Sequence, residues 1–198
     1  MSDRLRLAVL LSGTGRTLEN LIAWQRRGDL LAEVVCVASN RAKVRGLDIA
    51  REAGIPARSF RMSEYAGRAE RDRAMAKWAR EHRCDLVLLA GYLSLLDLAG
   101  FDGVRVLNIH PALLPRHGGE GCWGHHVHEA VLEAGDLESG CTVHLVDAEF
   151  DRGRILAQSA VPVLPDDDPD TLAARVFDAE CGLYPDTVNR IARGELEV

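Results

Sequence analysis

The residues best suited to chemistry stand at the end of one apolar run. Residues 104–109 read as a buried strand, and Asn108 and His110 come at its end, directly before Pro111. Because side chains alternate along a strand, Asn108 and His110 point to the same face. An amide can donate a hydrogen bond to a developing oxyanion and an imidazole can move a proton near neutral pH, which suits acyl transfer. The alternative is structural: an Asn that caps a turn and a His that satisfies a loop carbonyl.

A second candidate site follows the apolar run Leu7 to Leu11, where a Gly-x-Gly turn leads into a helix. Free backbone N–H groups and the helix dipole can hold an anion there, or the turn can simply connect the two elements. A dinucleotide motif would need its third glycine where Leu18 stands, and no P-loop Gly-Lys-Ser/Thr sequence is present. The anion site would comprise the turn and the first helical residues, in which an arginine could add charge and a threonine a hydroxyl: Gly13, Thr14, Gly15, Arg16 and Thr17.

The order of apolar and amphipathic segments predicts an α/β fold with a doubly wound, mostly parallel sheet. Ligands of such sheets bind outside the carboxyl ends of the strands, where Gly13, Gly91 and Asn108 all stand. The predicted strands span residues 7–11, 33–38, 57–60, 86–90 and 104–109. The first predicted helix carries Leu18, Leu21 and Ile22 on its apolar face, and two more span residues 44–53 and 64–83, the last capped by Ser63.

The second half of the chain has a different character. The segment Arg116 to Gly124 holds four glycines and predicts a loop that could move over a ligand. A helix over 126–134 follows, and strands over 141–146 and 155–163 predict an antiparallel extension of the sheet. The last helix starts at residues 166–168, and Pro185 is expected to bend or restart it. His125, His126 and His128 could suggest a metal, but no carboxylate or cysteine is spaced to complete a shell, so we expect none.

Composition places the chain among ordinary globular proteins. Its 198 residues suit one domain, residues 1–198, and are 47% hydrophobic and 27% charged. A net charge of −6 disfavours a nucleic-acid partner held by phosphate contacts. The five cysteines form no C-x-x-C pair, which favours reduced thiols and a cytoplasmic location. The short first apolar run predicts neither a signal peptide nor a membrane span.

Four segments resemble the folate-dependent formyltransferases, and within that family the enzymes acting on 5′-phosphoribosylglycinamide (GAR) in purine biosynthesis. The similarity runs from Leu7 to about Leu196, and it implies a Rossmann-like formyltransferase fold. The segments are SGTGRTL at residues 12–18, SNRA at 39–42, LNIHPALLP at 107–115 and TVHLVDAEFDRGRILAQ at 142–158.

The resemblance also implies roles for individual residues. The Asn and His of N-I-H-P and the Asp of the later D-x-G form the catalytic trio of the family, which here are Asn108, His110 and Asp151. Gly13 to Thr17 would bind the substrate phosphate, and Glu180 would contact the substrate amine. The implied folate-binding residues lie in two segments: Leu93, Ser94, Leu95 and Leu96, then Asp147, Ala148, Glu149 and Asp151.

Four positions depart from the family pattern. Ser94 stands where an arginine is expected and the loop after Pro115 is longer than usual, and both changes bear on the substrate. Arg152 stands where a glycine is usual, which bears on the conformation of its loop. The phosphate turn reads G-T-G-R-T in place of G-N-G-S-N, which keeps its donors and adds a cation. We therefore keep a second acceptor open, such as an amino sugar nucleotide.

The reaction implied is transfer of a formyl group from 10-formyltetrahydrofolate, the co-substrate, to the amine of GAR, without a metal. Asn108 and His110 would stabilise the oxyanion, and His110 with Asp151 would carry the proton. We expect the carboxylate to hold His110 partly charged. A hydrolase that releases formate from the same folate is an alternative, although such enzymes are expected to carry a further domain. The expected partners are these small molecules, with no nucleic acid and no membrane, in a monomer or a homodimer.

Overall fold

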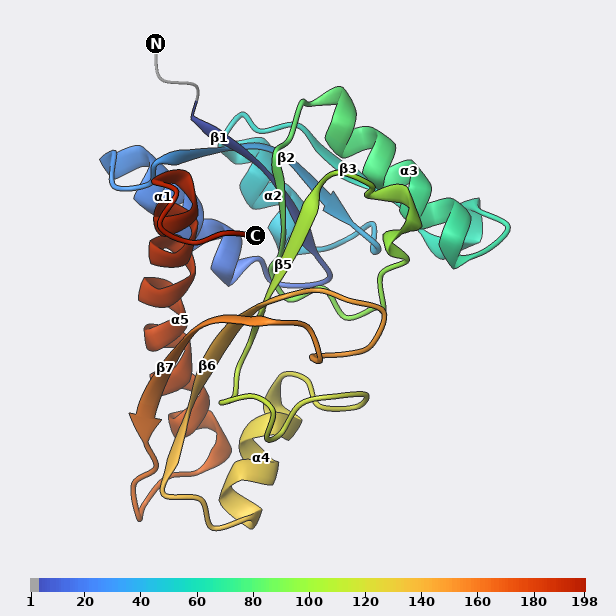
Figure 1. Cartoon of the computed structure of the whole chain (residues 1–198). Helices are drawn as coiled ribbons and strands as arrows, with labels where there is room; N and C mark the ends of the chain where they lie inside the picture. The colour runs from blue at the N-terminus through green and yellow to red at the C-terminus, as the bar shows by residue number, and fades with distance from the viewer. Residues whose placement is uncertain (1–3) are drawn as a thin grey trace.

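The computed structural model describes residues 4–198, which form one sheet of seven strands with helices on both faces (Figure 1). The strand order is β3-β2-β1-β4-β5-β6-β7. The first five strands in this order are parallel, whereas β6 is antiparallel to both β5 and β7. This confirms the predicted fold class, including its antiparallel C-terminal extension. The strands are β1 Leu5–Leu11, β2 Ala32–Ser39, β3 Ala57–Ser59, β4 Leu86–Leu89, β5 Arg105–His110, β6 Glu138–Leu145 and β7 Ile155–Pro162.

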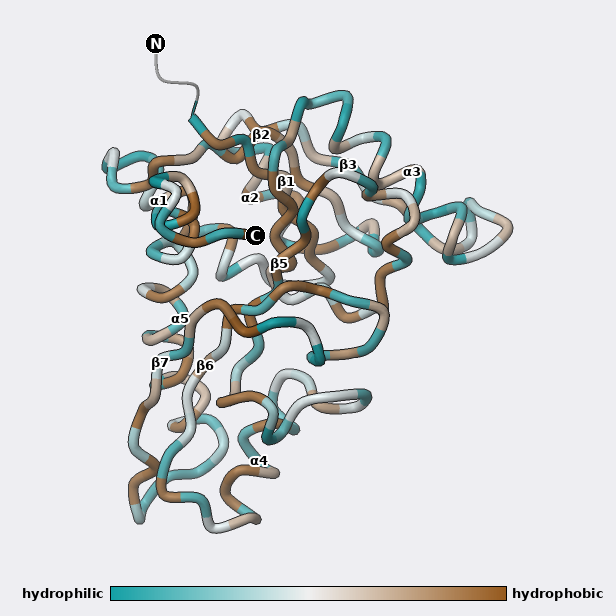
Figure 2. Tube along the Cα trace, in the orientation of Figure 1, coloured by the Kyte–Doolittle hydropathy of each residue, from teal (hydrophilic) through white to brown (hydrophobic). Residues whose placement is uncertain are grey.

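Helices cover the two faces unequally. The helices are α1 Arg16–Arg27, α2 Arg45–Glu52, α3 Arg68–Glu81, α4 His125–Glu133 and α5 Pro169–Ala192, with short 3-10 turns at Met62–Glu64 and Leu98–Gly100. One apolar layer joins the sheet to α1, α2 and α5, and the other joins it to α3. Alternation along β5 places Leu107 and Ile109 in the first layer and Val106 in the second, as its sequence predicts. Figure 2 shows the apolar residues gathered along the central strands.

The glycine turn after β1 is required by the packing of α1 against α2. Gly15 has φ +78°, and a Cβ atom on it would lie 2.5 Å from the Cα of Gly46. The amide of Gly46 donates to the carbonyl of Gly13 at 3.1 Å. The structural interpretation of Gly15 therefore holds, and it leaves the anion-binding interpretation of the same turn open.

The predicted helix over residues 64–83 is wrong at its start. Glu64 instead closes a 3-10 turn, in which its carboxylate binds the side chain and backbone amide of Arg61. The α-helix begins only after Gly67, and Glu70 caps the preceding bend by accepting from the amide of Ala66 at 2.8 Å. Ser63 is therefore not a helix cap, because local side-chain pairs stabilise the turn instead.

Helix α5 passes through Pro185 as one helix, which excludes a restart there, one of the two expected effects of this proline. Proline has no N–H to donate to the carbonyl four residues earlier, which is that of Cys181. In the structure Asn20 of α1 donates its side-chain amide to this carbonyl at 2.8 Å. A tertiary hydrogen bond thus replaces the missing helical one. No helix within residues 4–198 combines the length and the apolar character needed to cross a membrane.

Candidate active site

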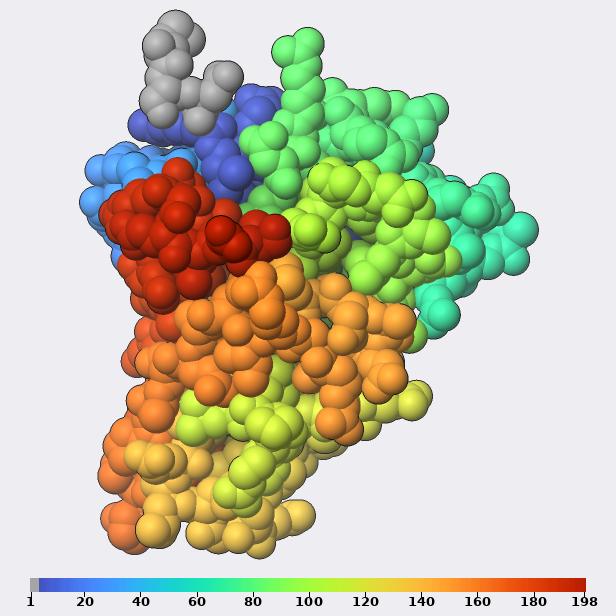
Figure 3. Space-filling view, viewed as in Figure 1, coloured from blue at the N-terminus to red at the C-terminus, as the bar shows by residue number. Residues whose placement is uncertain are grey.

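A cavity of about 530 Å³ lies at the carboxyl ends of the parallel strands. Its walls come from the end of β5, the segment after β4, the glycine loop before α4 and the loop between β6 and β7. Figure 3 shows the segment that holds the β6–β7 loop, in orange, on the surface between the N-terminal half and α4. The polar and charged groups of the walls include Thr17, Ser94, Asn108, His110, Glu120, His144, Glu149, Asp151 and Glu180.

Asn108 meets two side chains from the neighbouring β6 and the loop after it. Its amide nitrogen lies 3.1 Å from Nε2 of His144 and 3.4 Å from Oδ1 of Asp151. Nδ1 of His144 lies 2.8 Å from the carbonyl of Leu145, which can only accept, so we assign the ring proton to Nδ1. Nε2 of the neutral ring then accepts from Asn108. This contact fixes the amide with its nitrogen toward the carboxylate.

His110 is buried and is held at both ring nitrogens. Nε2 donates to the carbonyl of His117 at 2.8 Å, and Nδ1 lies 3.4 Å from Oδ2 of Asp151. Burial lowers the pKa of His110 below its ordinary value, and this effect outweighs the opposing charge of Asp151. The expectation that Asp151 holds the ring partly charged is therefore wrong. At neutral pH the ring is mostly neutral, with the lone pair of Nδ1 available as a base.

Asp151 stays ionised although it is largely buried. Burial acts to raise its pKa, but hydrogen bonding from His144, the charge of His110 and the amide of Gly119 together lower it below the ordinary value. The Gly119 amide donates to Oδ2 at 3.0 Å. Nε2 of His144 lies 3.5 Å from Oδ1 of Asp151. The backbone of Asp151 has φ +56°, a conformation that aspartate tolerates better than most residues.

Glu180 projects from α5 into the same cavity. Burial raises the pKa of its carboxyl to about 8, and the nearby charge of Arg16 only partly opposes this shift. Glu180 is therefore mostly protonated at neutral pH. The guanidinium of Arg16 lies 3.7 Å from the centre of the Phe177 ring, so this cation is directed toward α5.

The structure brings most, but not all, of the predicted site residues to the cavity. Of the predicted phosphate-binding residues only Thr17 lines it, whereas Gly13, Thr14, Gly15 and Arg16 do not. The whole segment Leu93 to Leu96 lines it from the other side. In the β6–β7 loop, Glu149 and Asp151 reach the cavity, whereas Ala148 lines an adjoining one together with Arg152. Asp147 lines neither; its carboxylate accepts from the amide of Glu149 at 3.0 Å.

His144 is a site residue that sequence reasoning missed. It lies directly opposite Asn108 in the antiparallel register of β5 and β6, just as Thr142 lies opposite His110. The available signal was a pair of polar residues two apart, Thr142 and His144, within the apolar second half of this strand, matching the spacing of Asn108 and His110. Within residues 4–198 no three His, Cys, Asp or Glu side chains gather as a metal site requires.

Comparison with known proteins places this geometry in a family. The family described as formyl transferase matches residues 5–188. A phosphoribosylglycinamide formyltransferase from Haemophilus influenzae is 36% identical over 98% of this chain and 90% of its own length. The trifunctional purine biosynthetic protein adenosine-3 of Gallus gallus is 40% identical over 100% of this chain, which spans only 19% of that relative.

A solved structure gives the same result. Glycinamide ribonucleotide transformylase 1 from Symbiobacterium toebii superposes with a TM-score of 0.93 and 36% identity, covering 100% of this chain and 92% of the other. The resemblance that the four sequence segments indicate is thereby confirmed, and the chain belongs to the formyl transferase family.

Proposed function

We propose that this chain transfers the formyl group of 10-formyltetrahydrofolate to the amine of GAR, giving formyl-GAR and tetrahydrofolate. The observation that carries the proposal is the cluster of Asn108, His110 and Asp151 on one wall of the 530 Å³ cavity. An amide donor, a neutral imidazole and an ionised carboxylate are the groups that acyl transfer to an amine requires. Relatives that carry this activity in their names support the choice of substrates.

In the proposed reaction the amine nitrogen of GAR attacks the formyl carbon, and the carbonyl electrons move to its oxygen. The second N–H of Asn108, whose contact with Asp151 is long at 3.4 Å, is the donor proposed to stabilise this oxyanion. Nδ1 of His110 takes the proton that the amine loses. The imidazolium so formed is stabilised by Asp151 on one side and the His117 carbonyl on the other.

The intermediate then collapses. The bond between the formyl carbon and N10 of the folate breaks, and His110 returns its proton to the departing nitrogen. Atoms and charge balance without a further reactant, and the His110 ring ends neutral, as it began. A lowered pKa suits both proton transfers. The ring is neutral and can accept the proton of the attacking amine, and the imidazolium then releases that proton readily to N10 of the folate.

The remaining walls are proposed to hold the two substrates. Gly13 to Thr17 would bind the phosphate of GAR through the N-terminus of α1. Leu93 to Leu96 and the loop from Asp147 to Asp151 would hold the folate. Glu180, kept mostly protonated by its burial, would contact the amine of GAR and ionise beside a cationic ammonium.

The test is a product assay with the purified chain. We expect formyl-GAR to accumulate in step with tetrahydrofolate when GAR and 10-formyltetrahydrofolate are both present. Release of formate without GAR would favour the hydrolase, and formylation of an amino sugar nucleotide in competition with GAR would favour the second acceptor.

A further inference from the structure

One short segment holds two of the proposed catalytic residues through its backbone. The carbonyl of His117 accepts from Nε2 of His110 at 2.8 Å, and the amide of Gly119 donates to Oδ2 of Asp151 at 3.0 Å. The two contacts come from opposite sides of Gly118. The position of this segment therefore sets the orientation of both the imidazole and the carboxylate.

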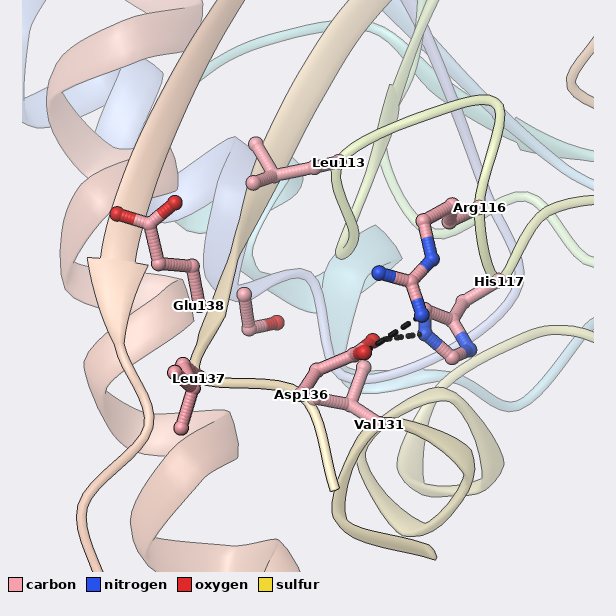
Figure 4. Close-up of a pocket in the computed structure, with 8 residues that line it drawn as sticks. Leu113, Arg116, His117, Val131, Asp136, Leu137 and Glu138 are labelled. Atoms are coloured by element: carbon pink, nitrogen blue, oxygen red, sulfur yellow. Dashed lines mark hydrogen bonds and ion pairs between the residues drawn. The ribbon is translucent and has the colours of Figure 1, made fainter. Parts of the chain in front are cut away.

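The segment is anchored from outside the cavity by Asp136, in the turn between α4 and β6 (Figure 4). Oδ1 of Asp136 binds Nη2 of Arg116 at 2.5 Å, and Oδ2 binds Nε2 of His117 at 2.7 Å. The Asp136 side chain is only 11% exposed and that of His117 16%, whereas Arg116 is 65% exposed. The His117 contact is thus the more shielded of the two and should contribute more to holding the segment.

The backbone of the segment needs such an anchor. His117 has φ +52°, in the left-handed region, which costs free energy for a residue with a side chain although histidine adopts it more often than most. Gly118 has no room for a side chain, because a Cβ atom on it would collide with Leu114 and approach Asp151. The segment is therefore closely packed against the site, and Asp136 stabilises its backbone by a hydrogen bond to the side chain of His117.

We propose that Asp136 and His117 are positioning residues for this enzyme, which hold the carbonyl of His117 on His110 and the amide of Gly119 on Asp151. The inference rests on the proposed function only in naming the reaction that the two held residues perform. Neither Asp136 nor His117 lines the main cavity, so neither is expected to contact a substrate.

The proposal predicts a change in the titration of the held residues. The charged and titratable groups that face His110 are Asp151 and His144 from β6 and its following loop, His117 from the anchored segment and His128 from α4. The bond to the His117 carbonyl raises the pKa of His110, and the Gly119 amide lowers that of Asp151. Releasing the segment should therefore lower the pKa of His110 and raise that of Asp151.

Asp136→Asn is the first variant, with Glu138→Gln as its matched control. Glu138 lines the same outer cleft as Asp136, but its carboxylate makes no hydrogen bond or ion pair within residues 4–198, so its loss should change neither kcat nor KM. For Asp136→Asn we expect kcat to fall by about tenfold to a hundredfold, the range that small misplacements cost, with both KM values nearly unchanged. Equal behaviour of the two variants would overturn the proposal.

A second pair of variants covers the case in which Asp136→Asn fails to fold. His117→Phe removes the donor to Asp136 at similar size, whereas His117→Gln keeps a donor. We expect His117→Phe to lose kcat and His117→Gln to recover most of it. Loss of kcat to the same extent in both would mean that the imidazole is needed for something other than the hydrogen bond, against the proposal.

The closing experiment does not depend on turnover. The His110 ring is followed by NMR as the pH is changed, in the parent, Asp136→Asn and Glu138→Gln. His117→Phe is left out of this measurement, because the charge of His117 lowers the pKa of His110 and its loss would oppose the effect of the released segment. The proposal predicts a lower titration midpoint in Asp136→Asn and the parent midpoint in Glu138→Gln. An unchanged midpoint in Asp136→Asn would overturn it. If the parent makes no formyl-GAR but these midpoints move as expected, the proposed function fails while the positioning role stands.

Discussion

Asn108 and His144 face one another across β5 and β6, and the amide nitrogen of Asn108 lies 3.1 Å from Nε2 of His144. Because Nδ1 of His144 is committed to the carbonyl of Leu145, Nε2 is left to accept. The imidazole therefore determines which end of the Asn108 amide points into the cavity. The tautomer of His144 with its proton on Nδ1 thus orients the N–H of Asn108 that would donate to the oxyanion.

We expect His144→Phe to lower kcat by about tenfold to a hundredfold, less than the loss of an oxyanion donor outright, because the amide stays but loses its orientation. Both KM values should change little. The control is His125→Phe, since His125 is exposed at the start of α4 and does not line the cavity. A large rise in KM without loss of kcat would contradict a role in orienting Asn108.

Glu180 should make stability depend on pH. The pKa of its carboxyl is raised from 4.5 to about 8 in the folded chain, so the folded state keeps a proton that the unfolded state releases. The free energy of unfolding should therefore fall as pH rises between these values, by at most about 1.4 kcal/mol per pH unit from this group.

Urea unfolding of the parent and Glu180→Gln across this range measures the effect. The variant should gain stability relative to the parent as pH rises, because it has no proton to lose. Glu133→Gln, at the exposed end of α4, supplies the control and should follow the parent. Parallel stability curves for the parent and Glu180→Gln would show that Glu180 ionises normally.

Substitutions at Gly13 and Gly15, in the turn after β1, should distinguish a structural role of this turn from a role in binding phosphate. A Cβ atom at Gly15 would lie 2.5 Å from the Cα of Gly46, so Gly15→Ala should cost about 1–3 kcal/mol of stability. A Cβ atom at Gly13 meets nothing within 4 Å, so Gly13→Ala should fold normally. If the turn binds phosphate, Gly13→Ala should raise KM for GAR several-fold and leave KM for the folate unchanged. An equal rise in both KM values would mean that the turn is only structural.

The parts of the fold and site that could be predicted from the sequence are those that local patterns determine. The apolar runs Leu7–Leu11 and residues 86–89 are buried on both faces, so their order with the helices predicts the parallel sheet. The alternation of side chains along β5 predicts that Asn108 and His110 share a face. Ligands of doubly wound sheets bind outside the carboxyl ends of the strands, which predicts that these two residues line the binding site.

The rest depends on contacts between distant residues. The continuity of α5 through Pro185 requires Asn20 on α1, and the anchor of His117 requires Asp136 beyond α4. The pKa of His110 is lowered because its ring is buried, and the spacing of residues in the sequence does not reveal that burial. The charge of Asp151 taken alone predicts a raised pKa, which is the wrong direction.

The central claim is that His110 and Asp151 transfer the proton during formylation of GAR, and Asp151→Asn tests it most directly. The variant keeps the shape of the side chain but removes the anion that raises the pKa of His110. Because His110 must be neutral to accept the proton, the acidic limb of kcat should lie below pH 6.5 in the parent and move lower in the variant.

The measurement is the rate of formyl-GAR formation against pH for the parent, Asp151→Asn and the control Asp147→Asn. The carboxylate of Asp147 accepts from the amide of Glu149 and does not line the cavity, so it is not near the proton that moves. We expect Asp151→Asn to lose kcat by about a hundredfold or more with little change in either KM, whereas Asp147→Asn should stay within about tenfold, or 1.4 kcal/mol in the barrier. A parent that forms no formyl-GAR, or an Asp151→Asn variant with full activity and an unmoved acidic limb, would contradict the account.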